Sequence, residues 1–254
     1  MNVKNNFLYA LNTFMGSLKK SWLEWLVTIS LFILSGIISI SIYPKMRANY
    51  DNQIERYSYS GETIGSLQVG IFIVLIPFLL VSILSIIIPK RIDICYAYLS
   101  LIQTLALTLL VTEALKVTVA RPRPNFFSYC GYNTTTQKCH GKQKHQRDAR
   151  LSFPSGHSSN SFSSGTWLSL FLSVIIPQCQ IWWILLKFIP IGIATFVSAT
   201  RIIDYMHHVS DVVGGALIGV GVAIMIFSSQ SSRVFILNNS QEEEQLLEPN
   251  ESLL

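Results

Sequence analysis

The chain has 254 residues, of which 50% are hydrophobic and only 13% are charged, whereas soluble globular domains carry roughly 25% charged residues. The hydrophobic residues form long blocks of about 18 to 22 residues, the length needed to cross a hydrocarbon core of roughly 30 Å. The formal net charge is +5. The composition therefore excludes an ordinary soluble domain, whose core helices are shorter and amphipathic, and indicates an integral membrane protein.

Six apolar blocks follow one another along the chain and predict an all-α polytopic membrane protein with six transmembrane helices embedded in the lipid bilayer. The blocks cover residues 22–42, 67–88, 94–115, 158–176, 181–199 and 212–227. The sixth block contains Gly215 and Gly219, a spacing that predicts close packing against a neighbouring helix.

The blocks divide the chain into three regions. Residues 1–21 are expected to form a cytoplasmic segment, because they are too polar for a cleavable signal peptide. Residues 22–228 are expected to form the six-span domain. Residues 229–254 are acidic and are expected to form a solvated cytoplasmic tail.

The positive charge concentrates in one loop. Residues 116–157 contain eight Lys and Arg residues but only one acidic residue, Asp148. A basic loop in an otherwise near-neutral chain indicates an anionic ligand at the membrane surface. Nucleic acid is not the expected partner, because the loop lacks interleaved aromatic residues and any recognised nucleic-acid module. Since each span reverses the side, this loop and residues 200–211 lie on the same membrane face.

These two loops contain the candidate site residues. The candidates are Lys116, Arg123, Ser155, Gly156, His157, Arg201, His207 and Asp211. A single histidine or arginine at the end of a span is usually an interfacial residue. Three polar patterns on one membrane face are more easily explained by a common function.

The spacing of the candidates indicates phosphate chemistry. His207 and Asp211 are four residues apart, so a helix that begins near His207 would let the carboxylate orient the imidazole as a nucleophile. Ser155 and Gly156 stand at the start of the fourth block, where free backbone N–H groups favour an anion. The cationic candidates supply fixed charge for the equatorial oxygens of a phosphoryl transition state.

The chain resembles a known family in these segments. Residues 116–124, 154–157 and 200–211 resemble the signature KxxxxxxRP, PSGH and SRxxxxxHxxxD of the type 2 phosphatidic acid phosphatase superfamily, and especially its eukaryotic lipid phosphate phosphatases. Thr200 stands where the pattern has Ser, and it keeps the hydroxyl. The resemblance implies a membrane phosphatase for phosphate monoesters of lipids such as phosphatidate, lysophosphatidate and diacylglycerol pyrophosphate.

The resemblance also implies a role for each candidate. His207 would attack phosphorus and form phosphohistidine, Asp211 would orient it, and His157 would protonate the departing oxygen and then activate water. The phosphate-binding residues would be Lys116, Arg123, Ser155, Gly156 and Arg201. No metal or other cofactor is expected, because the sequence contains no HExxH motif, EF-hand loop or Walker loop.

Alternative functions stay open at this point. The same residues would serve a phosphatase for isoprenoid diphosphates or for a soluble sugar phosphate. A transporter or a non-catalytic lipid-binding relative is a further alternative. The sequence makes no prediction of the preferred lipid or of the oligomeric state.

Other features predict the orientation. Cys130 and Cys139 bracket a short polar segment and would form a disulfide if it lies outside the cytosol, with two free thiols as the alternative. Asn133 begins a glycosylation sequon between them. Glu242, Leu246 and Leu247 resemble an acidic dileucine signal, which a sorting adaptor would bind in the cytosol. We therefore expect a multi-pass protein of the plasma membrane or an endomembrane, with cytoplasmic termini and a luminal or extracellular active site.

Overall fold

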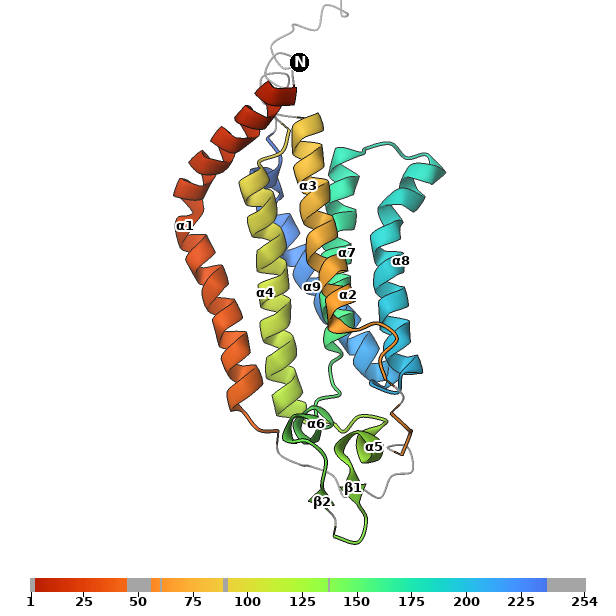
Figure 1. The fold of residues 1–254 in the computed structure, drawn as a ribbon. Coiled ribbons are helices and arrows are strands. Elements are labelled where there is room, and N and C mark those ends of the chain that lie inside the picture. Colours follow the sequence, from red (N-terminus) through yellow and green to blue (C-terminus); the bar gives the residue numbers. More distant parts are fainter. Residues whose placement is uncertain (1–2, 45–55, 60, 89–90, 137, 237–254) are drawn as a thin grey trace, which may run out of the picture.

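The computed structural model describes residues 3–44, 56–59, 61–88, 91–136 and 138–236, and the described chain is almost entirely helical. Long helices form a bundle, and short elements cap one end of it (Figure 1). The elements are α1 (Val3–Ser41), α2 (Ser66–Gly70), η2 (Ile71–Leu75), α3 (Ile76–Ile87), α4 (Ile94–Val119), α5 (Phe126–Cys130), β1 (Tyr132–Asn133), β2 (Lys138–Cys139), α6 (Gln143–Asp148), α7 (Gly156–Ile175), α8 (Ile181–Ile203) and α9 (Val209–Val234).

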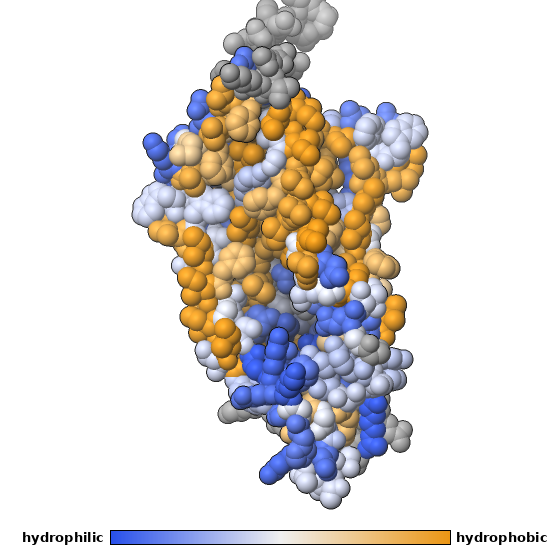
Figure 2. Space-filling model, in the orientation of Figure 1, coloured by the Kyte–Doolittle hydropathy of each residue, from blue (hydrophilic) through white to orange (hydrophobic). Residues whose placement is uncertain are grey.

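Five helical segments of the described chain are long and apolar enough to cross a membrane. They are Asn5–Ser41, Ser66–Ile87, Ile94–Val119, Ile181–Ile203 and Val209–Val234. Apolar side chains cover the flank of the bundle, whereas polar ones gather around the end with α5, α6 and the hairpin (Figure 2). The protein is therefore an all-α, multi-pass membrane protein, as predicted.

The predicted fourth span, α7, is not among these five segments, so the count of six spans is not confirmed. Its sequence is rich in serine, and it packs against α9, α8 and α4 in the middle of the bundle. Several serines form bonds to neighbouring helices: Ser158 Oγ donates to the Val212 carbonyl at 2.7 Å, and Ser164 Oγ to the Ile73 carbonyl at 2.8 Å. A helix enclosed by other helices needs no continuous apolar surface, and hydropathy is therefore a weak signal for it.

Helix boundaries differ from the apolar blocks at both ends of the chain. Helix α1 begins at Val3, so it includes most of residues 1–21 rather than starting after them. Helix α9 continues to Val234, beyond the predicted domain end at residue 228. Polar residues continue both helices past their apolar parts, which a hydropathy pattern does not reveal. Two further glycosylation sequons begin at Asn238 and Asn250; these two residues and Glu242, Leu246 and Leu247 lie outside the described residues.

Two glycines allow α9 to pack closely on α7. A Cβ atom added to Gly215 would lie 2.6 Å from the carbonyl oxygen of Ser155, and one added to Gly219 would lie 2.2 Å from that of Ser159. The close packing predicted from the GxxxG spacing is thus present. It holds the beginnings of α7 and α9, which carry the candidate catalytic residues, at the same end of the bundle.

The cap at this end is a compact polar unit. A disulfide bond joins Cys130 of α5 to Cys139 of β2, with their Cα atoms 5.4 Å apart. These are the two cysteines that the sequence predicts to pair. Strands β1 and β2 form an antiparallel hairpin in which Asn133 is opposite Lys138, and the Asn133 side chain is exposed. The cap places α6 over the pocket described below.

Candidate active site

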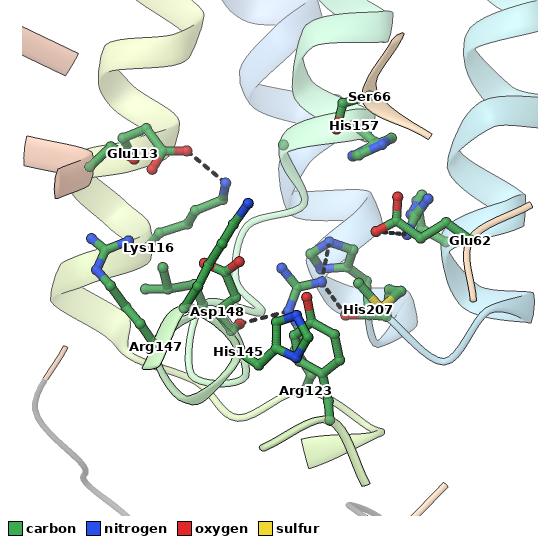
Figure 3. Close-up of a pocket in the computed structure, with 17 residues that line it drawn as sticks. Glu62, Ser66, Glu113, Lys116, Arg123, His145, Arg147, Asp148, His157 and His207 are labelled. Atoms are coloured by element: carbon green, nitrogen blue, oxygen red, sulfur yellow. Dashed lines mark hydrogen bonds and ion pairs between the residues drawn. The ribbon is translucent and has the colours of Figure 1, made fainter. Parts of the chain in front are cut away.

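A polar pocket of about 380 Å³ lies where α4 and α8 end and α7 begins. Figure 3 shows side chains from several elements converging on it. The predicted residues that line it are Lys116, Arg123, Gly156, His157, Arg201 and His207. Three segments that are distant in sequence therefore meet at one cavity. The other two candidates, Ser155 and Asp211, are fully buried and do not line it.

His207 is held as a neutral base. Its Nδ1 atom lies 2.7 Å from the carbonyl oxygen of Ser152, and because a carbonyl only accepts, Nδ1 must carry the proton. Its Nε2 atom is then unprotonated and lies 3.5 Å from a terminal nitrogen of Arg123. Burial, with the charges of Arg123 and Lys116, lowers the pKa of the His207 imidazole well below its ordinary value. The Nε2 lone pair is therefore free for nucleophilic attack at neutral pH.

Asp211 lies close to the His207 imidazole, but no direct hydrogen bond joins the two side chains. Helix α9 begins at Val209 with His208 as N-cap, so His207 precedes the helix and shares no helical face with Asp211. The Asp211 carboxylate lies 3.9 Å from Nδ1 of His207. Instead it accepts from Ser152 Oγ at 2.5 Å and from the backbone N–H of His208 at 2.9 Å.

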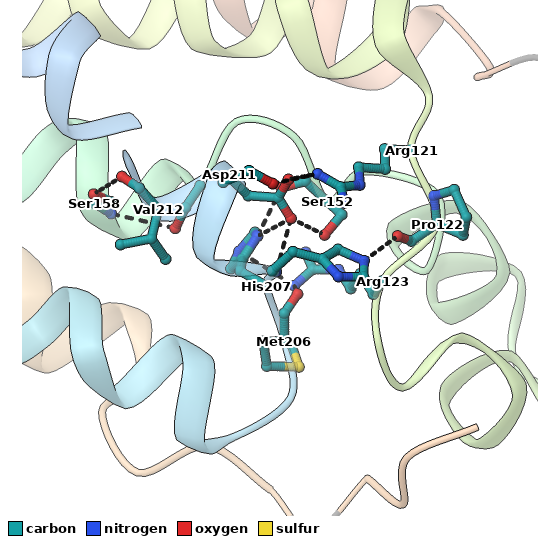
Figure 4. Close-up of polar contacts among 12 residues, drawn as sticks. Arg121, Pro122, Arg123, Ser152, Ser158, Met206, His207, Asp211 and Val212 are labelled. Carbon is teal, nitrogen blue, oxygen red and sulfur yellow. Dashed lines mark hydrogen bonds and ion pairs between the residues drawn. The ribbon is translucent and has the colours of Figure 1, made fainter. Parts of the chain in front are cut away.

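Ser152 connects the two residues (Figure 4). Its hydroxyl donates to Asp211, while its backbone carbonyl accepts from Nδ1 of His207. Arg121 donates to the other carboxylate oxygen of Asp211 at 2.7 Å. Asp211 is thus connected to His207 through the Ser152 segment. The sequence predicts no role for Ser152 or Arg121, and only the repeated Arg-Pro pattern at residues 121–124 indicates the latter.

The three predicted cations are fixed by different partners. Arg123 donates to the backbone carbonyls of Asp148 at 2.8 Å and Met206 at 3.1 Å. Burial lowers the pKa of its guanidinium, but an arginine stays charged at neutral pH. Arg201 donates to the Ile64 carbonyl at 2.7 Å, and Lys116 forms an ion pair of 2.6 Å with another side chain of α4. Their positive charges surround one cavity.

The start of α7 provides His157, the second candidate histidine, and a close contact between Gly156 and Lys116. Ser155 is the N-cap, and its hydroxyl accepts from the Ser158 N–H at 3.4 Å, so it serves the helix rather than the cavity. A Cβ atom at Gly156 would lie only 3.0 Å from Nζ of Lys116, so glycine leaves room for this cation. His157 lines the cavity, and its buried Nε2 has no hydrogen-bond partner in the described part of the chain.

Residues outside the predicted segments also line the cavity. They are Glu62 and Ser66 near α2, Glu113 of α4, Tyr129 of α5, and Lys144, His145, Arg147 and Asp148 at α6. The strap, defined here as residues 56–59 and 61–65, contacts the third candidate segment, residues 200–211. Thr63 N–H donates to Asp204 at 2.9 Å, and the ring of Tyr57 stacks on Tyr205 at 4.2 Å. No motif in the sequence marks these residues.

The described residues contain no group of three or more His, Cys, Asp or Glu side chains that could hold a metal ion. The pocket instead concentrates lysine and arginine around three histidines, which suits an anion with several oxygens. The fold and the site thus define a multi-pass helical membrane protein with an anion pocket at one membrane face.

Comparison with known proteins identifies the family. Residues 97–235 match the PAP2 superfamily, and this chain belongs to it. The chain is 31% identical over 218 residues to lipid phosphate phosphatase 2 of Arabidopsis thaliana, covering 80% of this chain and 75% of that relative. It is 30% identical over 216 residues to lipid phosphate phosphatase 1 of the same plant, covering 80% and 66%. Human phospholipid phosphatase 2 is 34% identical over 131 residues, covering 45% and 44%. No solved structure matches the chain significantly.

Proposed function

We propose that the protein is an integral membrane phosphatase that removes phosphate from lipids through a phosphohistidine on His207. The observation that carries this proposal is the unprotonated Nε2 of His207 beside Arg123, in a pocket that also holds His157 and four further lysine and arginine side chains. The names of the relatives support a lipid substrate: besides the plant and human proteins, a probable diacylglycerol pyrophosphate phosphatase of Schizosaccharomyces pombe is 32% identical over 132 residues.

The first step transfers the phosphoryl group to the protein. Nε2 of His207 attacks phosphorus, and a bond from nitrogen to phosphorus forms as the bond from phosphorus to the lipid oxygen breaks. That oxygen takes a proton from His157, whose protonated form the bound phosphate dianion favours. The cations around the pocket stabilise the charge on the equatorial oxygens.

The second step releases the phosphate. His157 has given up its proton and now accepts one from a water molecule, whose oxygen attacks phosphorus. The bond from phosphorus to His207 breaks, inorganic phosphate forms, and His207 returns as a neutral imidazole. Asp211, through Ser152, keeps the ring oriented in both steps.

A substrate panel tests the proposal. Purified protein would be assayed against phosphatidate, lysophosphatidate, diacylglycerol pyrophosphate, dolichyl diphosphate and a soluble sugar phosphate. We expect the highest kcat/KM with the glycerolipid phosphates. A preference for dolichyl diphosphate or for the sugar phosphate would select one of the alternative phosphatases. Absence of turnover with every compound would favour a non-catalytic lipid-binding relative.

Activity is expected to persist in excess EDTA. The charge that the transition state requires comes from Lys116, Arg123 and Arg201, side chains that need no metal. Orthovanadate is expected to inhibit, because it mimics the five-coordinate phosphoryl group. Rates of phosphate release before and after chelation provide the measurement. Loss of activity in EDTA that added Mg²⁺ restores would overturn metal independence.

We further propose that the pocket faces the lumen or the cell exterior and that both termini are cytoplasmic. The disulfide between Cys130 and Cys139 supports this orientation, because disulfides persist in oxidising compartments. Asn133 is exposed on the hairpin of β1 and β2. This hairpin lies at the same end of the bundle as α6 (Figure 1), and residues of α6 line the pocket. In the plasma membrane or an endomembrane, this would leave Glu242, Leu246 and Leu247 accessible to a cytosolic sorting adaptor.

Glycosylation tests this orientation. Glycosidase treatment is expected to lower the apparent mass of the wild-type protein but not that of Asn133→Gln, because the hairpin would be glycosylated on the luminal side. A tag at the carboxyl terminus should resist protease in sealed right-side-out vesicles. A glycan on Asn238 or Asn250 would invert the orientation.

A further inference from the structure

Two carboxylates stand among the cations of the pocket. Glu113 and Glu62 line the cavity, and Figure 3 shows them at opposite walls. Neither belongs to the three predicted segments, and neither has a role in the two steps above. Each forms an ion pair with a cation that the proposed function assigns to the substrate phosphate.

Glu113 holds Lys116. It lies one turn earlier on α4, is 8% exposed, and its Oε1 atom is 2.6 Å from the Lys116 ammonium. A buried carboxylate in a membrane helix is costly and usually serves a function. The ammonium that it holds is also the group that approaches Gly156 at the start of α7. Glu113 therefore neutralises the charge that faces the expected phosphate position.

Glu62 pairs with Arg201 more loosely. The Arg201 side chain is fully buried, and its Nε and one terminal nitrogen have no hydrogen-bond partner among the described residues. Glu62 approaches that terminal nitrogen at 3.4 Å, and its side chain is 30% exposed. Unsatisfied buried donors are costly, so these two nitrogens are available to an acceptor that enters the pocket.

We propose that Glu62 and Glu113 are internal counter-ions that hold Arg201 and Lys116 while the pocket is empty and release them to the phosphate. The proposal rests on the proposed function in taking phosphate as the ligand. Of the three cations that the proposed function assigns to phosphate, Lys116 and Arg201 are thus each paired with a carboxylate of the cavity wall, and Arg201 also lies 3.6 Å from the buried Asp204. A phosphate dianion must replace the carboxylate in both ion pairs. It therefore binds more weakly than it would bind to three unpaired cations. The two carboxylates compete with the inorganic phosphate product for the same cations. The product therefore dissociates more readily than it would from three unpaired cations.

Isosteric variants test the exchange. In Glu113→Gln and Glu62→Gln the shape is kept but the competing charge is lost. We expect each variant to bind inorganic phosphate about tenfold more tightly, the effect of removing one charged competitor worth about 1.4 kcal/mol. The measurement is calorimetric titration of the full-length protein in detergent with inorganic phosphate, supported by orthovanadate inhibition. Glu24→Gln is the matched control, because Glu24 pairs with Arg233 at 2.6 Å outside the pocket.

The outcomes separate the two proposals. Unchanged or weaker phosphate binding in a variant with a wild-type melting temperature would show that the carboxylates only orient the cations, and would overturn the exchange. If Glu113→Gln does not fold, Glu62→Gln still provides the test. Glu62 is partly exposed on the strap, so its replacement should disturb folding less than that of the buried Glu113. Tighter phosphate binding without turnover of any lipid phosphate would support the exchange and contradict the proposed function.

Discussion

Replacing His207 with alanine is expected to reduce turnover of a lipid phosphate by about 10⁴-fold or more, the effect of losing a nucleophile. No nearby group replaces it: Nε2 of His207 is the nitrogen beside Arg123, whereas His157 is required for proton transfer in both steps. Initial rates of phosphate release from phosphatidate in detergent micelles provide the measurement.

The matched control is His140→Ala. His140 lies exposed beside the hairpin and does not line the pocket, so its loss should leave kcat unchanged. A His207→Ala protein that folds and retains more than about a hundredth of the wild-type rate would contradict nucleophilic attack by His207.

The second large effect is expected for Asp211→Ala. Asp211 is fully buried and accepts bonds from Ser152, Arg121 and the His208 N–H. Its removal leaves the Ser152 hydroxyl and the His208 N–H unpaired, at about 1–3 kcal/mol for each buried donor, whereas the partly exposed Arg121 can be solvated. The Ser152 carbonyl would then no longer hold His207 in place, and we expect kcat to fall by about 10²- to 10³-fold.

Kinetics and thermal unfolding together separate positioning from stability. Glu24→Ala removes a different ion-paired carboxylate, outside the pocket, and should lower the melting temperature while kcat is kept. For Asp211→Ala we expect both quantities to fall. An Asp211→Ala enzyme with wild-type kcat would show that the contact through Ser152 has no part in orienting the nucleophile.

The sequence predicts the helices well where lipid contact determines composition. The blocks beginning at Ile94 and Ile181 start at the same residues as α4 and α8. The block at residues 158–176 also matches α7 closely, although this helix is surrounded by others and forms polar contacts in place of lipid contacts. The full extent of α1 was missed, since polar residues continue its helix toward Val3.

The spacing of motifs predicts which side chains meet but not which atoms bond. Six of the eight candidates line one cavity, because the topology brings their loops to one membrane face. The spacing of Asp211 predicted its proximity to His207 but not the connection through Ser152, because His207 precedes the helix that carries Asp211. The roles of Ser152 and the strap depend on contacts between distant residues, such as Thr63 with Asp204, 141 positions apart. No local pattern encodes such contacts.

Trapping the phosphoenzyme tests the central claim most directly. Wild-type protein mixed with phosphatidate radiolabelled in its phosphate would be denatured in alkali within one turnover, digested, and examined by mass spectrometry. We predict an alkali-stable, acid-labile label on the peptide that contains His207, and no label in His207→Ala. Phosphate on a serine, a threonine or His157, or turnover without any labelled peptide, would contradict a phosphohistidine intermediate at His207.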